Sequence, residues 1–202
     1  MEKDNLCSSE YATKLIFPKY KHVLEFGVWK GDSLRRIRSR LDDSYKVYGF
    51  DSFEGLPEDW LDHNGNLVGK GKKGRFSTGK KTPDINGVKW MVGWFSDTLP
   101  MYLKEADDIG LLHIDCDLYS STVEVLWALN NYIKKGTIIV FDEWFYNHST
   151  KYSDHEQKAF YEWVEKFNRK FSFVDFKDQT DAKNPKGKSY ETSERKIVKI
   201  LE

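Results

Sequence analysis

Two aspartates stand at the end of an apolar stretch in the segment LLHIDCDLYSST, residues 111–122. Asp115 and Asp117 are two positions apart, so in an extended backbone their side chains project to the same side and their negative charges repel. An ionised carboxylate at the end of a buried strand is costly unless it is paired, metal-bound or hydrated. The rest of the chain must therefore supply a partner, and a divalent cation would satisfy both groups.

A second pair of acids ends another apolar stretch, GTIIVFDEW, residues 136–144. Asp142 and Glu143 would add two hard oxygen ligands to the first pair. A ligand set of carboxylates without His or Cys suits Mg²⁺ better than zinc. The four acids therefore predict a magnesium site, and the plainer alternative is that they are solvated turn residues.

A nucleotide site is indicated by the segment VLEFGVWKGDS, residues 23–33. Gly27 and Gly31 fall between a predicted strand and a predicted helix, where missing side chains let a ligand approach backbone N–H groups and a helix N-terminus. The spacing is not that of a G-x-G-x-x-G dinucleotide loop, so a purely structural glycine turn stays open. Glu25, just before the glycines, could bind an ammonium group or shape the loop.

Asp51 ends the next apolar stretch, KVYGFD, residues 46–51. An acid at the end of the second strand of such a unit commonly binds ribose hydroxyls. The alternative is an aspartate that caps the turn at Ser52. Its position beside the glycine segment favours the ribose interpretation.

The elements that must position these residues alternate between strand and helix patterns. Apolar residues at helical spacing predict a helix over 32–41, and further helices are expected over 96–107, after Asp117, and over 154–167. Strands are expected over 22–27, 46–51, 88–94, 109–116 and 136–144, with a final antiparallel pair over 171–176 and 195–202. This alternation predicts an α/β fold with a doubly wound, mainly parallel sheet that binds ligands at the carboxyl ends of its strands.

One long segment, residues 56–87, shows neither helix nor strand periodicity and is rich in Gly, Lys and Pro. It is too long for an idle connection, and we expect an insertion that acts as an active-site lid within a single domain spanning residues 1–202. Within it, residues 69–81 carry six basic residues and no acid. This basic stretch is either a solvated loop or a contact for an anionic substrate.

Composition limits the class of protein. Lysine plus arginine and aspartate plus glutamate balance at 32 each, which gives no general electrostatic case for a nucleic-acid or membrane partner. The only two cysteines, Cys7 and Cys116, lie far apart, and this predicts reduced thiols rather than a disulfide framework. With no apolar stretch of membrane-spanning length, we expect a cytoplasmic location.

Five segments, in order, resemble the motifs of the macrocin O-methyltransferase (TylF-type) family. They are VLEFGVWKGDS, VYGFDSFEGLP, GWFSDTLP, LLHIDCDLYSST and GTIIVFDEW, and they cover about residues 22–145. The resemblance implies a seven-stranded Rossmann-like methyltransferase sheet and an S-adenosylmethionine- and Mg²⁺-dependent O-methyltransferase. The implied acceptor is a hydroxyl of a sugar or another small diol-bearing molecule, and a homodimer stays open.

The resemblance also implies a role for each matching position. Asp51 would hold the ribose hydroxyls, Asp117 would be the general base, and Glu143 stands where the family usually has a second aspartate. The implied cofactor-binding residues are Glu25, Gly27, Gly31, Asp51, Gly93, Trp94 and Phe95, and the implied metal ligands are Asp115, Asp142 and Glu143. Trp94 and Phe95 are equally consistent with ordinary core aromatics. We expect His113 in the core; His148 and His155 follow the fifth strand closely enough to be reserve bases, and the alternative for both is a surface position.

Two other functions stay open at this stage. A metal-dependent glycosyltransferase could use Asp115 and Asp117 to hold a metal and a sugar-nucleotide diphosphate, although the preceding glycine and ribose positions already form a nucleoside site. A non-catalytic module that binds S-adenosylmethionine would need no metal set, yet all four acids are present.

Overall fold

A computed structural model describes residues 6–144, 155–176 and 195–202 of the chain. Its sheet has seven strands in the order β3-β2-β1-β4-β5-β7-β6. The strands are β1 (His22–Phe26), β2 (Lys46–Asp51), β3 (Val88–Val92), β4 (Ile109–Ile114), β5 (Ile138–Phe141), β6 (Phe171–Phe173) and β7 (Lys196–Ile200). The predicted fold class is confirmed.

Strands β1 to β5 run parallel, and β7 lies antiparallel between β5 and β6. The strand order reverses at β1 and β4, which are neighbours although two strands separate them in the sequence. Ligands of open parallel sheets bind beyond the carboxyl ends of the strands at such a reversal. Asp51 ends β2, and the other pocket acids follow β4 and β5 directly or within three residues, so these acids converge there.

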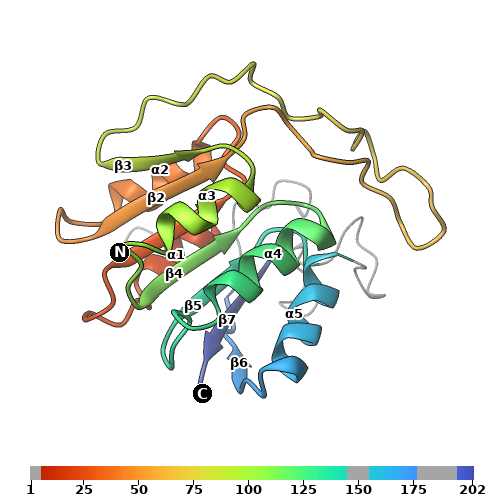
Figure 1. Ribbon diagram of the computed structural model, residues 1–202. Coiled ribbons are helices and arrows are strands. Elements are labelled where there is room, and N and C mark those ends of the chain that lie inside the picture. Colours follow the sequence, from red (N-terminus) through yellow and green to blue (C-terminus); the bar gives the residue numbers. More distant parts are fainter. Residues whose placement is uncertain (1–5, 145–154, 177–194) are drawn as a thin grey trace.

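Helices cover both faces of the sheet (Figure 1). On one face, α3 (Phe95–Tyr102), α4 (Tyr119–Leu129) and α5 (Glu156–Lys166) pack on a core that includes Leu99, Val125 and Phe160. On the other, α1 (Ser8–Thr13) and α2 (Asp32–Ser39) contribute residues such as Leu34. The sequence analysis did not predict α1, which is only six residues long.

The segment between β2 and β3 reaches past the carboxyl edge of the sheet and then runs back to the start of β3 (Figure 1). It contains no helix or strand element, and its one bridge joins Leu61 to Leu67. Leu56, Trp60 and Val68 form a small apolar cluster with Leu118, which precedes α4. The segment is therefore packed on the body of the protein at the start of α4.

Both cysteines are buried and free, as predicted. Among the described residues, no helix has the length and apolar character needed to cross a membrane.

Candidate active site

A pocket of about 680 Å³ opens at the carboxyl ends of the parallel strands. Every site residue predicted from the sequence except Glu25 lines it. These residues are Gly27, Gly31, Asp51, Gly93, Trp94, Phe95, Asp115, Asp117, Asp142 and Glu143. Residues separated by up to 116 positions along the chain thus share one cavity.

The turn after β1 requires its glycines. Gly27 has φ +85°, and a Cβ there would lie 1.8 Å from the carbonyl oxygen of Asp115. The bare Gly27 backbone therefore packs directly on the strand end that bears the acids. Gly31 has φ +78° and is the N-cap of α2, whose first two residues, Asp32 and Ser33, line the pocket.

Asp51, at the end of β2, binds the glycine turn through hydrogen bonds to its backbone. Its Oδ2 accepts hydrogen bonds from the backbone N–H groups of Val28 at 2.8 Å and Trp29 at 2.7 Å, and its Oδ1 accepts one from Phe53 at 2.6 Å. A carboxylate offers about four lone-pair sites. Three contacts leave room for one hydroxyl donor, so the capping role considered from the sequence exists and the ribose role stays a prediction.

Glu25 lies beneath the pocket rather than in its wall. It is completely buried, and its carboxylate accepts a hydrogen bond from Ser33 Oγ at 2.8 Å and contacts His113 Nδ1 at 2.9 Å. Of the two roles considered for Glu25, this arrangement favours shaping the loop, because Ser33 lies on α2. Direct contact with a bound molecule would require a rearrangement.

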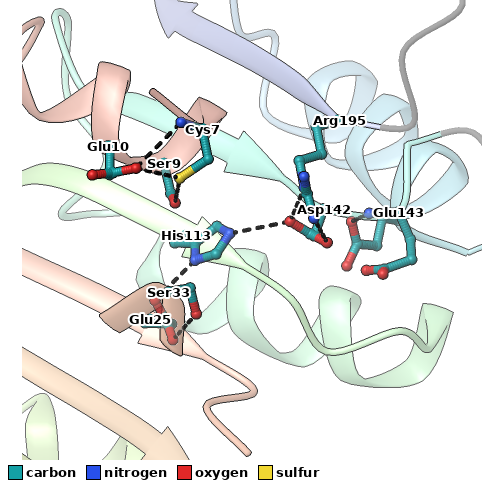
Figure 2. Close-up of polar contacts among 10 residues, drawn as sticks. Cys7, Ser9, Glu10, Glu25, Ser33, His113, Asp142, Glu143 and Arg195 are labelled. Carbon is teal, nitrogen blue, oxygen red and sulfur yellow. Dashed lines mark hydrogen bonds and ion pairs between the residues drawn. The ribbon is translucent and has the colours of Figure 1, made fainter. Parts of the chain in front are cut away.

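His113 bridges the two halves of the site, as Figure 2 shows. Its Nδ1 faces Glu25, and its Nε2 lies 3.7 Å from Asp142 Oδ1. Burial alone would lower the pKa of His113, but the two carboxylates outweigh burial and raise it well above the usual value. The residue is buried in the core, as expected, and it also links Glu25 to the acid pair after β5.

Three of the pocket acids lie close enough to share one cation. Oxygen atoms of Asp115, Asp117 and Glu143 all fall within 4.8 Å of one another. A second group of the same kind joins His113, Asp115 and Asp142. Burial, followed by repulsion from neighbouring carboxylates, raises the pKa of Asp115 and Glu143 well above the usual values.

Asp117 has an unusual backbone and an unusual carboxyl group. Its φ is +63°, in the left-handed region that a non-glycine residue rarely occupies, and the Leu118 N–H closes the turn on the Cys116 carbonyl oxygen at 2.6 Å. Burial and then the charge of Asp142 raise the pKa of Asp117 from its usual value of 3.8 to about 7. A carboxylate in that range can exchange a proton near neutral pH.

Asp142 has a basic partner that the sequence analysis missed. Arg195, just before β7, places Nε 2.5 Å from Asp142 Oδ1 and a second nitrogen 3.2 Å from Oδ2. Burial alone would raise the pKa of Asp142, but Arg195 and His113 hold it below its usual range. Of the three predicted metal ligands, Asp142 is thus the one that the protein already neutralises with its own cation.

Two further polar residues support the rim of the site. Glu156, at the start of α5, accepts a hydrogen bond from the Glu143 N–H at 3.1 Å. His155 Nδ1 accepts one from the Tyr119 N–H at 3.1 Å, and its Nε2 lies 2.8 Å from the Leu61 carbonyl oxygen. His155 therefore connects the long segment to α4 and does not face the acids, while His148 lies outside the described residues.

Most of the basic stretch, residues 69–81, faces solvent. Its six basic side chains are exposed, and only Phe76 from this stretch lines the pocket. Phe76 packs edge-on against Trp29 of the glycine turn, with ring centroids 5.5 Å apart. The contact of the segment with the pocket is therefore aromatic, and an interaction of its lysines with substrate stays a prediction.

Comparison with protein families gives one decisive match. Residues 24–144 match a family described as a methyltransferase domain, which is more than half of the chain. The chain belongs to this methyltransferase family. The matched region runs from β1 to the residues just after β5 and so includes all the predicted site residues, whereas Glu156 and Arg195 lie beyond it.

Two named relatives are O-methyltransferases of Streptomyces. The chain is 30% identical over 138 residues to the 8-demethyl-8-(2,3-dimethoxy-alpha-L-rhamnosyl)-tetracenomycin-C 4'-O-methyltransferase of Streptomyces olivaceus. It is 28% identical over 138 residues to the demethyldecarbamoylnovobiocin O-methyltransferase of Streptomyces niveus. Each alignment covers 60% of this chain and 52% of the relative, so the similarity extends over about half of each relative.

Among solved structures, the calicheamicin methyltransferase CalS11 superimposes with a TM-score of 0.68. The superposition covers 95% of this chain and 77% of CalS11, at 20% sequence identity. At that identity the likeness concerns the fold, which it supports over nearly the whole chain.

Proposed function

We propose that this protein is an O-methyltransferase that moves a methyl group from S-adenosylmethionine to a hydroxyl of a sugar or other diol-bearing small molecule, assisted by Mg²⁺. The observation that carries the proposal is the single pocket in which the glycine turn and Asp51 adjoin Asp115, Asp117 and Glu143. A nucleoside site next to an acid cluster is what a metal-assisted transfer from a nucleoside donor needs. The match to the methyltransferase family and the names of the two relatives agree with it.

The glycine side of the pocket fits S-adenosylmethionine. Gly27 and Gly31 leave the turn without side chains, and Asp51 keeps a lone pair for a ribose hydroxyl while it holds the turn closed. Trp94 and Phe95 line the pocket after β3, and Phe95 packs edge-on against Phe26 with ring centroids 5.1 Å apart. These residues offer the apolar wall that an adenine ring needs.

The acid side fits Mg²⁺. Carboxylates at mutual distances below 4.8 Å are hard oxygen donors, and Glu143 Oε2 is buried without a hydrogen-bond partner among the described residues. An orphaned buried carboxylate oxygen calls for a cation or a proton. We assign Asp115, Asp142 and Glu143 as ligands, and the alternative set replaces Asp142 by Asp117 because Arg195 already contacts Asp142.

When bound, S-adenosylmethionine would supply an electrophilic methyl group and Mg²⁺ would lower the pKa of a coordinated hydroxyl. The protein's own part is alignment and proton transfer. Asp117 takes the hydroxyl proton on its carboxylate, and its raised pKa suits that exchange near neutral pH. Trp29 and Phe76, which pack edge-on against each other, line the pocket on the glycine side.

Thermal unfolding with ligands separates this function from its alternatives. A ligand that binds only the folded state raises the melting temperature with its concentration. S-adenosylhomocysteine should stabilise the protein, and Mg²⁺ should add to that effect in wild type. Stabilisation by a sugar nucleotide without any by S-adenosylhomocysteine would instead indicate a glycosyltransferase. Stabilisation by S-adenosylhomocysteine with no effect of Mg²⁺ would indicate a methyltransferase that needs no metal or a binding module.

A further inference from the structure

Glu156 is a buried acid outside the wall of the pocket. It is the first residue of α5 and is 0% exposed, and its Oε2 accepts the hydrogen bond from the Glu143 N–H. It does not line the pocket, and it does not belong to either group of close potential ligands. Its contact is with the main chain of a proposed metal ligand.

The surroundings of Glu156 are unusual for a residue with only a structural role. Its Oε1 and the Oε2 of Glu143 are both buried and lack hydrogen-bond partners among the described residues. Burial raises the pKa of Glu156 well above the usual value, and repulsion from Asp142 and Asp117 adds to this. Four acids already lie at this edge of the sheet, so the charge of a fifth buried acid is unfavourable in the metal-free protein.

The hydrogen bond from the Glu143 N–H suggests a role for Glu156. Glu143 is the second residue after β5, and its backbone N–H is held by the carboxyl group of Glu156. A glutamate has one more rotatable bond than an aspartate, so it loses more conformational entropy when it binds a metal. Fixing the backbone of Glu143 removes part of the freedom that the longer side chain adds.

We propose that Glu156 is a positioning residue that orients Glu143 for the cation. This inference rests on the proposed function, because it assumes that the acid cluster binds a metal. Partners of this kind, which orient ligands without contacting the metal, typically change metal affinity about 10–100-fold when they are lost.

The competing explanation is simple helix stabilisation. An acid in the first turn of α5 interacts favourably with the helix dipole, and its loss would lower stability without a specific effect on metal. The two explanations differ in what they predict for Glu156→Gln, since an amide oxygen still accepts the Glu143 N–H but carries no charge.

The test measures Mn²⁺ affinity by electron paramagnetic resonance and S-adenosylhomocysteine affinity by calorimetry on the full chain. Glu156→Ala should weaken Mn²⁺ binding about 10-fold or more and leave S-adenosylhomocysteine binding unchanged. Glu156→Gln should stay within about threefold of wild type, because it keeps the hydrogen bond. Glu165→Gln, an exposed acid on the same helix, is the matched control and should change neither affinity.

A double-mutant cycle with Glu143 completes the design. If Glu156 acts through Glu143, then Glu156→Ala should have no further effect on Mn²⁺ affinity in a Glu143→Ala background. Glu156→Met, which keeps the side-chain volume without an acceptor, replaces Glu156→Ala if that variant does not fold.

Two results would have different meanings. Wild-type metal affinity in Glu156→Ala or Glu156→Met, or an equal loss in Glu156→Gln, overturns the positioning role while the proposed function stands. A wild-type protein that binds no Mn²⁺ at all overturns the metal site itself, and the role of Glu156 falls with it.

Discussion

The crowded acids should make the metal-free protein less stable as the pH rises. Asp117 shows this most clearly, because its pKa moves from 3.8 to about 7 on folding. A carboxyl group with a raised pKa binds more protons in the folded state than in the unfolded state between the two values. The stability that this raised pKa contributes is therefore fully present below pH 3.8, the pKa of the group in the unfolded chain. It is lost as the pH rises through about 7, the pKa in the folded protein.

The magnitude follows from the size of that shift. One pKa unit corresponds to about 1.4 kcal/mol, so Asp117 alone should remove about 2–3 kcal/mol of stability between about pH 5 and pH 8. For a domain of this size that corresponds to a fall of roughly 5–10 °C in melting temperature. Asp115 and Glu143, whose pKa values are also raised, add to the loss, while the contribution of Asp142 is already complete above about pH 4.

Urea unfolding of wild type and Asp117→Asn, both in excess chelator, measures the contribution of Asp117 to the free energy of unfolding. The asparagine keeps the shape and cannot titrate, so the stability of wild type relative to the variant should fall by about 2–3 kcal/mol from about pH 5 to pH 8. The comparison also cancels groups that do not interact with Asp117, such as buried His22, whose lowered pKa acts in the opposite direction. Parallel pH profiles for the two proteins would refute the conclusion that Asp117 is protonated in the folded state at pH 5.

Three further predictions concern the pocket wall. Asp51→Ala should weaken S-adenosylhomocysteine binding by about 1–3 kcal/mol in calorimetry, because the ribose hydroxyls lose their buried acceptor, and unchanged affinity would refute the ribose assignment. Gly27→Ala should fail to bind S-adenosylhomocysteine, since its Cβ would meet the Asp115 carbonyl oxygen, whereas Gly74→Ala, with open space around it, should bind as wild type does. Phe76→Ala should raise KM for the methyl acceptor more than the triple replacement of Lys72, Lys73 and Arg75 by Ala, because of these four residues only Phe76 lines the pocket. A larger rise in KM for the triple variant at low salt would indicate instead that the basic stretch contacts the substrate.

The sheet and most of the site could be predicted from the sequence because both depend on short-range patterns. Strands of four to six residues with an Asp at their last position or directly after it define, at the same time, the edge at which these acids meet. Parallel pairing then brings Asp51, Asp115 and Asp142 together whatever the lengths of the connections. The predicted third strand, 88–94, ran two residues too far, because Gly93 leaves the strand at φ +142°.

The partners of these acids could not be predicted from local patterns. Arg195 reaches Asp142 across 53 positions because β7 inserts between β5 and β6, and no periodicity specifies that pairing. In the sequence, Glu156 looks like an ordinary polar residue of an amphipathic helix. Its burial follows from the way α5 packs on the rest of the protein. The helix signal itself was clear over 154–167, whereas α1 is too short to show a helical period.

Roles that depend on which way a side chain points could not be predicted from the sequence either. Glu25 alternates with its neighbours in a strand that is buried on both faces, so nothing in the pattern tells whether it points into the pocket or toward His113. For the six basic residues between 69 and 81, the sequence left open a solvated loop and a contact with an anionic substrate. The turns at Gly69, Gly74 and Gly79, each with positive φ, leave those side chains at the surface.

The central claim is a metal-assisted methyl transfer with Asp117 as the base, and one assay tests it directly. Transfer of labelled methyl from S-adenosylmethionine to a panel of sugars, nucleotide sugars and other vicinal diols is measured for wild type with Mg²⁺, wild type with excess chelator, and Asp117→Asn with Mg²⁺. We predict transfer to at least one diol by wild type with Mg²⁺, little with chelator, and loss of most activity in a variant that still binds Mn²⁺. Undiminished transfer in chelator, or normal turnover by Asp117→Asn, would contradict the mechanism.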